Sequence, residues 1–190
     1  MLRLAVRALE ALLEWVTILL MVVLTAVVIV AVLFRLAGES FSWYDEVAAI
    51  LLAWITYYGA ALAALKRRHI GFDTVLLAIP MPWRMVALVF AEAVTVGFFV
   101  LLAVTGLEVL SVLEGMRLVS LTFVPVQLTQ SVIPIGAMLF ILCQLLSLPD
   151  YWSKTARGIS LEHAEIEEEV EEETRKAAAM AAAKSSGGRA

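Results

Sequence analysis

Long apolar stretches recur along the chain, each close to the length that a membrane crossing requires. Four of them carry no charge or a single one, and they cover residues 15–34, 47–65, 85–107 and 118–148. A helix needs about 20 residues, at about 1.5 Å each, to cross roughly 30 Å of hydrocarbon. The first three stretches therefore each fit one crossing, whereas the fourth is too long for one crossing and too short for two.

The fourth stretch is best divided into an interfacial segment at 118–125 and a span at about 126–148. Lipid-exposed backbone has to satisfy its own hydrogen bonds, so the spans are expected to be helices. The pattern thus predicts an all-α membrane protein in which a membrane domain, residues 15–152, contains four transmembrane helices. Their expected bounds are about 15–34, 47–65, 85–107 and 126–148.

The residues before the first span show a different periodicity. Arg3, Arg7, Glu10 and Glu14 fall on one narrow helical stripe between leucines. This pattern predicts an amphipathic helix over residues 1–14 that lies in the membrane plane, although a plain extension of the first span is the alternative. The 20 apolar residues that follow exceed a signal-peptide core, and no clear small-residue cleavage site comes after them, so a retained anchor is favoured.

Basic residues are distributed unevenly between the loops. If the N-terminus is cytoplasmic, eight basic side chains lie inside (Arg3, Arg7, Lys66, Arg67, Arg68, Arg84, Lys154 and Arg157) and two lie outside (Arg35 and Arg117). This bias predicts a multi-pass protein with both termini in the cytoplasm. Residues 153–190 are expected to form an acidic, alanine-rich cytoplasmic tail.

Composition supports a membrane protein and excludes several other classes. The chain is 62% hydrophobic and 17% charged, whereas soluble domains are about 45–50% apolar and about 25% charged. Its net charge of −4 arises in the tail, which carries 8 acidic and 4 basic residues after position 161. No basic surface for nucleic acid is predicted.

The residues that enzymes and metal sites need are largely missing. Cys143 is the one cysteine, and His69 and His163 both lie outside the spans, so neither a disulfide nor a transmembrane bis-histidine haem site is expected. The sequence has no nucleophile–base pair and no Walker-type phosphate loop. We therefore expect no enzymatic activity, no cofactor and no metal.

Glu92 is the one charged residue inside a predicted span. An ionised carboxylate at mid-helix costs roughly 2.5–3.5 kcal/mol on the insertion scale, so it requires a partner or a proton. The favoured interpretation is a pair with a basic or hydroxyl group on a neighbouring helix, in this chain or in another subunit. The alternative is a self-sufficient small transporter, a homo-oligomer in which Glu92 couples ion movement to transport.

Two further spans carry polar or small residues with helical spacing. In the last span, Gln130 belongs to a polar stripe that is expected to face protein rather than lipid. On the helix that contains the second span, Trp43 and Glu46, which precede the span, share one side with Trp54. Within the span, Gly59 opens a run of small residues that permits close helix approach.

The order of these residues is similar to that of a known family. The chain resembles the small membrane subunit (DctQ-type) of the tripartite ATP-independent periplasmic (TRAP) transporters over about residues 1–152. The motifs that carry the resemblance are Trp43-x-x-Glu46, Trp54, Gly59-Ala60-Ala61, Arg68-His69-Ile70-x-x-Asp73, Pro80-x-Pro82-x-Arg84, Pro125 and Ile133-Pro134-Ile135-Gly136.

The resemblance implies a non-catalytic scaffold in the bacterial inner membrane. Its partners would be a large multispan subunit that holds the transport and ion sites, a periplasmic substrate-binding protein, and membrane lipid. The complex would import a small organic anion, driven by an ion gradient. The residues that match the family pattern would then shape the fold or the subunit contact rather than bind substrate; these are Trp43, Glu46, Trp54, His69 and Asp73. Asp45 beside Glu46 leaves open which carboxylate fills the family's position.

Overall fold

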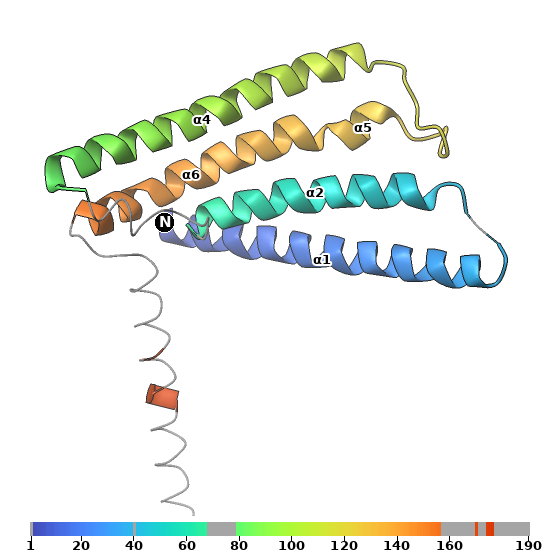
Figure 1. The fold of residues 1–190 in the computed structure, drawn as a ribbon, viewed down its shortest axis with the longest axis horizontal. Helices are drawn as coiled ribbons and strands as arrows, with labels where there is room; N and C mark the ends of the chain where they lie inside the picture. Colours follow the sequence, from blue (N-terminus) through green and yellow to red (C-terminus); the bar gives the residue numbers. More distant parts are fainter. Residues whose placement is uncertain (1, 40, 68–78, 157–169, 171–173, 177–190) are drawn as a thin grey trace, which may run out of the picture. The chain divides into compact units, whose positions relative to one another are not determined.

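The computed structural model describes residues 2–39, 41–67, 79–156, 170 and 174–176 of the chain. Its helices with defined bounds are shown in Figure 1: α1 (Leu2–Leu36), α2 (Tyr44–Leu65), α4 (Met81–Val112), α5 (Val126–Gln130) and α6 (Val132–Ala156). Among the described residues, an isolated antiparallel bridge between Arg117 and Pro125 is the one extended pairing.

Among the described residues, four segments are long and apolar enough to cross a membrane, and they contain the four spans predicted from the sequence. Their bounds are Val6–Leu36, Tyr44–Leu65, Met81–Val112 and Val126–Ser153. These segments extend past the predicted apolar cores and include charged residues there, such as Glu10 and Glu14 in the first and Arg84 in the third. The 22 residues of α2 span about 33 Å, so that α2 is the helix whose length best matches the hydrocarbon thickness.

The N-terminal segment differs from the expectation. Residues 2–14 are not a separate in-plane helix, because α1 continues without a break for 35 residues, or about 52 Å. The sequence contains no glycine or proline that would end a helix before residue 36. Instead, Glu10 and Glu14 of the amphipathic stripe lie 3.3 and 3.4 Å from the ammonium nitrogen of Lys66.

The fourth span consists of two helices separated by a turn. Pro134 has no backbone N–H to donate to the carbonyl of Gln130, and the helix is interrupted one residue later, at Ser131. The backbone N–H of Ser131 donates to the Gln127 carbonyl at 2.9 Å, so α5 ends in a closed turn before α6 begins.

The chain divides into two compact units, residues 1–70 with 90–149, and residues 71–89 with 150–190. In the described part of the second unit, α4 begins after Pro80 with Pro82 in its first turn, where no backbone donor is needed. The Arg84 side chain binds the residues just before α4, since its Nε donates to the Ile79 carbonyl at 3.2 Å.

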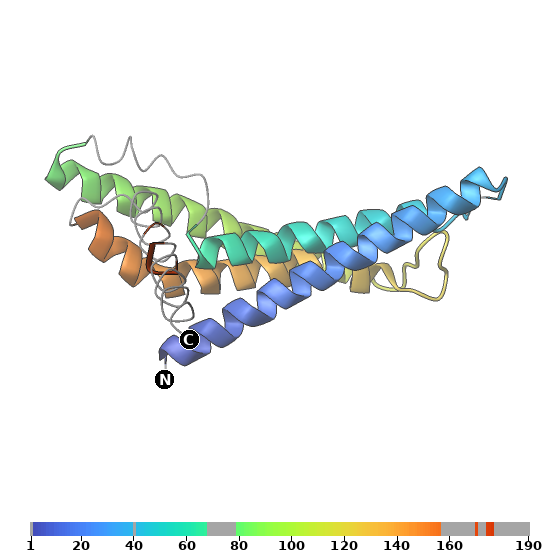
Figure 2. The ribbon, with the colours of Figure 1, turned by 90° about the horizontal axis from the view of Figure 1, so that it is seen from below.

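In the first unit, contacts link α1 to α2, α2 to α6, and α6 to α4. α1 runs beside α2 (Figures 1 and 2), and the rings of Phe99 on α4 and Phe140 on α6 stack with centroids 3.6 Å apart. The buried core lies where these helices meet, and its members are Leu13, Ala61, Ala64, Leu65, Phe140 and Cys143.

Two glycines allow neighbouring helices to approach α6 or its first turn. A Cβ atom added at Gly136 would lie 2.6 Å from the Cβ of Tyr57, and one at Gly106 would lie 3.1 Å from the Cγ2 of Ile133. The first distance is too short for two carbon atoms, so α2 and α6 pack at their observed separation because residue 136 has no side chain.

We predict that Gly136→Ala lowers the stability of the protein by about 1–3 kcal/mol, because overpacking forces the α2 and α6 backbones apart. Gly97→Ala is the matched control, since no heavy atom lies within 4 Å of its added Cβ and alanine favours a helix by up to about 1 kcal/mol. Thermal unfolding in detergent, followed by size-exclusion chromatography, measures both variants. Equal unfolding temperatures would contradict the close packing at Gly136.

Candidate functional site

A network of polar side chains joins three helices where α2 ends. Arg67 follows the C-cap of α2 and adopts a positive φ of 51°, which is uncommon for a residue other than glycine. Its guanidinium forms an ion pair with the carboxylate of Glu92 on α4. The Nε of Arg67 donates to the Oγ of Ser147 at 2.8 Å, and its Nη2 donates to the backbone carbonyl of Gln144 at 3.0 Å.

Glu92 is held at both carboxylate oxygens. Oε1 pairs with Arg67, and Oε2 accepts a hydrogen bond of 2.7 Å from the side-chain amide of Gln144 on α6. The Ser147 hydroxyl extends the network to α2, because its oxygen lies 3.1 Å from the carbonyl of Ala64. The side chains of Arg67 and Glu92 are only 13% and 14% exposed. The sequence required a partner for Glu92, and the structure supplies it from the same chain.

Because the network is buried, its effect on stability depends on how well its charges are paired. Removing two charges from water costs several kcal/mol per ion, and the cost is recovered only when geometry is good and the remaining hydrogen-bonding groups are satisfied. Here four side chains share these bonds. These bonds can form only when α2, α4 and α6 are aligned so that the four side chains lie at the same level. The network therefore favours that alignment of the helices.

A second, more exposed contact links the N-terminal half of α1 to the same end of α2. Lys66 pairs with Glu10 and Glu14, and the three side chains are 26%, 37% and 49% exposed, respectively. Pairs with this exposure contribute about 0–1 kcal/mol. The Lys66 contacts therefore add little to the stability of the helix packing.

The opposite end of α2 binds a loop. The carboxylate of Glu46 accepts hydrogen bonds from the backbone N–H groups of Val119 at 3.1 Å and Ser120 at 2.9 Å. The Ser120 hydroxyl in turn donates to the Ser42 carbonyl at 3.0 Å. Asp45 is exposed, so of the two adjacent acids it is Glu46 that joins the loop to α2.

Tryptophan and glutamine side chains connect α5 to its neighbours. The indole N–H of Trp54 on α2 donates to the Thr129 carbonyl at 3.1 Å, and the side-chain amide of Gln127 donates to the Leu110 carbonyl at 3.0 Å. The short helix α5 is thereby tied to both α2 and α4. Trp43 packs on the ring of Phe41 with centroids 5.5 Å apart.

Not every residue singled out in the sequence takes part in these contacts. Gln130 is exposed, and no heavy atom lies within 4 Å of a Cβ placed on Gly59, so neither residue forms a close contact between described helices. His69 and Asp73 lie outside the described residues.

Sequence reasoning missed Arg67 and Gln144, which bind Glu92, and Ser147, which binds Arg67. Arg67 entered the sequence analysis only as one of the eight basic residues expected on the cytoplasmic side, and Gln144 and Ser147 were not singled out. A usable signal was present, since Gln144 and Ser147 stand three residues apart within the otherwise apolar stretch 132–149 and therefore share a helix face.

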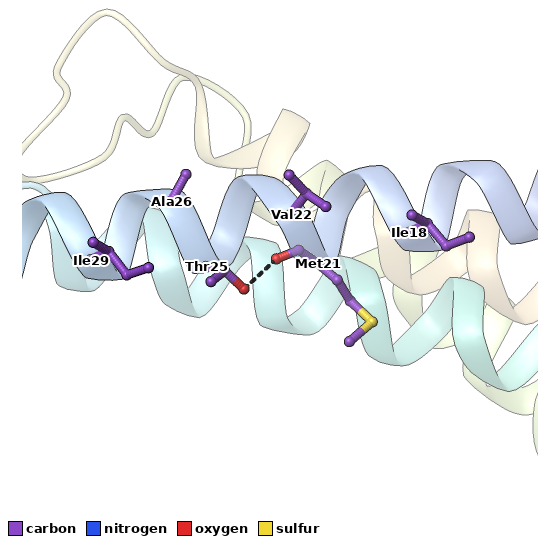
Figure 3. A pocket seen from close by; sticks show the side chains of 6 residues that line it. All are labelled: Ile18, Met21, Val22, Thr25, Ala26 and Ile29. Atoms are coloured by element: carbon purple, nitrogen blue, oxygen red, sulfur yellow. Dashed lines mark hydrogen bonds between the residues drawn. The ribbon is translucent and has the colours of Figure 1, made fainter.

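The outer face of α1 carries a hollow of a different character. It is lined by Ile18, Met21, Val22, Thr25, Ala26 and Ile29 (Figure 3). Its one hydroxyl, on Thr25, donates to the Met21 carbonyl of the same helix at 2.8 Å. An apolar surface of this kind suits an acyl chain or another helix rather than a charged solute.

A comparison with family models decides the identity of the chain. The model described as "Tripartite ATP-independent periplasmic transporters, DctQ component" matches residues 24–152, which is more than half of the sequence. The chain belongs to this family. It is therefore the DctQ small membrane subunit of a TRAP transporter, a multi-pass membrane protein and not an enzyme. No curated protein matches the chain.

The DctQ match includes both polar contact regions at the two ends of α2. Glu46 and its loop lie inside residues 24–152, and so do the four side chains of the Arg67–Glu92 network. Glu10 and Glu14, which bind Lys66, lie before the matched range. The two regions that fix the helices of this DctQ subunit thus belong to the part of the chain that defines the family.

We predict that Arg67→Met destabilises the DctQ subunit by about 3–5 kcal/mol, because it leaves the buried Glu92 carboxylate without its cation. The double variant Arg67→Met/Glu92→Leu should recover most of this loss, since neither charge then remains buried. Unfolding temperature and detergent-solubilised yield measure the series. A double variant that is no more stable than Arg67→Met would argue against the charge pair.

We also predict that Glu46→Gln weakens the loop contact, because hydrogen bonds to a charged carboxylate are stronger than those to a neutral amide. A glutamine amide group would direct N–H donors toward the N–H donors of Val119 or Ser120. Asp45→Asn is the matched control, because Asp45 is exposed. Protease cleavage within residues 113–125 should accelerate in Glu46→Gln and stay unchanged in Asp45→Asn.

Proposed function

We propose that this DctQ subunit is a fixed framework for the large membrane subunit of its transporter. In this proposal the large subunit holds the transport and ion sites, and a periplasmic binding protein delivers the cargo. The complex uses an ion gradient to import a small organic anion such as a carboxylate across the bacterial inner membrane. The excess of basic residues in one set of loops supports a cytoplasmic location for both termini.

The observation that carries this proposal is that both carboxylate oxygens of Glu92 are bound within the chain. A carboxylate that couples ion movement to transport has to exchange its partners during each cycle. Glu92 instead has both oxygens engaged by Arg67 and Gln144, and those side chains link α4 to α2 and α6. Breaking the pair would loosen the helices as well as free the carboxylate, so the arrangement favours a structural role.

The exposed apolar surface supports a partner in the membrane. Trp15 on α1 is 72% exposed, and Phe90 and Leu101 on α4 are 70% and 62% exposed. Apolar side chains of this size on the outer faces of spans are suited to lipid and to the helices of another subunit, where close packing rather than the hydrophobic effect drives association.

Uptake assays in proteoliposomes test the proposal. We predict that the DctQ subunit alone transports no more organic acid than empty vesicles, whereas the full set of large subunit, DctQ subunit and binding protein does transport it. Glu92→Gln should lower the yield of the purified complex and leave the uptake rate per assembled complex close to wild type. Uptake by the DctQ subunit alone, abolished by Glu92→Gln with assembly intact, would show instead that this chain is a self-sufficient transporter.

A further inference from the structure

The loop between α4 and α5 is unusual because it exposes apolar side chains while its backbone is internally bonded. Val119 is 90% exposed and Phe123 is 74% exposed. From residue 118 to the end of the loop the sequence contains no charged side chain. Apolar side chains exposed to water are unfavourable, so the exposure of these side chains suggests surroundings other than water.

Several polar groups of this backbone have hydrogen-bond partners within the protein. The N–H of Leu118 donates to the Val124 carbonyl at 3.1 Å, and the N–H of Val124 donates to the Leu121 carbonyl at 2.9 Å. The guanidinium of Arg117 lies 3.4 and 3.2 Å from the carbonyl oxygens of Thr122 and Phe123. The Glu46 carboxylate accepts the next two N–H groups, those of residues 119 and 120.

Internal bonding of this kind is what a non-helical segment needs in order to approach hydrocarbon. Backbone groups that lack a partner are tolerated in water but not in the apolar part of a bilayer. The loop is also held firmly, since Leu118 is buried and Gly115 adopts the positive φ of 80° that turns the chain out of α4. Its exposed apolar side chains are therefore presented by a fixed backbone.

The bonds to Glu46 also fix the level of the loop relative to the membrane. Glu46 lies in the first turn of α2, and α2 has the length of one hydrocarbon crossing. Trp43 and Tyr44 precede it, and these residue types concentrate at the membrane–water interface. A loop bonded directly to Glu46 thus lies at the headgroup level and does not project far into water.

We propose that residues 117–125 form a lipid-anchoring element, in which Val119 and Phe123 insert into the bilayer at the interface beside the N-terminal end of α2. The occupant of this apolar surface is the boundary between lipid headgroups and acyl chains. The assignment rests on the level set by α2, the uncharged sequence and the internal hydrogen bonds of the loop, and it holds for either orientation of the chain in the membrane.

Site-directed spin labelling of the complex with the large subunit tests this proposal. Cys143 is replaced by alanine, and single cysteines are introduced by Val119→Cys or Phe123→Cys. Glu39→Cys and Leu101→Cys serve as references, because Glu39 is an exposed loop residue and Leu101 is an exposed residue within a span. The complexes are placed in nanodiscs of phosphatidylethanolamine and phosphatidylglycerol, without the binding protein.

Accessibility to oxygen and to a water-soluble nickel chelate measures the depth of each label. We expect labels at 119 and 123 to show a ratio of oxygen to nickel accessibility above that at 39 and below that at 101, unchanged when binding protein is added. Labels as accessible to nickel as the label at 39 would overturn the proposal. So would protection that requires the binding protein, which would identify a docking surface, or shielding from both reagents, which would place the loop against the large subunit.

Discussion

The ion pair between Arg67 and Glu92 is the interaction on which the arrangement of the helices depends. In a bilayer the hydrophobic effect hardly distinguishes a neighbouring helix from lipid, so helix order has to be specified by close packing and polar contacts. Arg67 at the end of α2, Glu92 on α4 and Gln144 on α6 can bind one another only when the three helices are in register. If a helix were misplaced, one of the two charges would stay buried without its partner, which would destabilise the protein. The contacts therefore favour one arrangement of the helices over others.

α2 carries the second polar contact at its other end, where Glu46 binds the backbone of residues 119 and 120. One helix of membrane-spanning length therefore fixes α4 and α6 at one end and the loop between α4 and α5 at the other. Between these points the helices meet through small residues and stacked rings, as at Gly136 against Tyr57 and at Phe99 against Phe140. Polar contacts at the ends and close packing in the middle act together.

The spans could be predicted from the sequence because length and apolarity are local properties that a bilayer enforces. The interruption at Ser131 also has a local cause in Pro134. The partners of Glu92 and Glu46 could not be assigned, because those bonds join residues 25 to 74 positions apart and depend on which helices are neighbours. The in-plane helix was predicted from a polar stripe alone. Two of its four charged residues, Glu10 and Glu14, turn out to face Lys66.

The distribution of burial shows how such a chain can serve as a framework. In the most apolar window of each span, 44% of the residues of the fourth are buried, against 6–11% for the other three. The fourth span is therefore the most buried of the described spans, and α1, α2 and α4 leave most of their apolar surface available to lipid or to other helices. A solute pathway would need polar groups that are free to bind the solute. Glu92 and its neighbours instead bind one another and so join the helices. A subunit built in this way gains rigidity from its polar side chains and offers its partners an apolar surface.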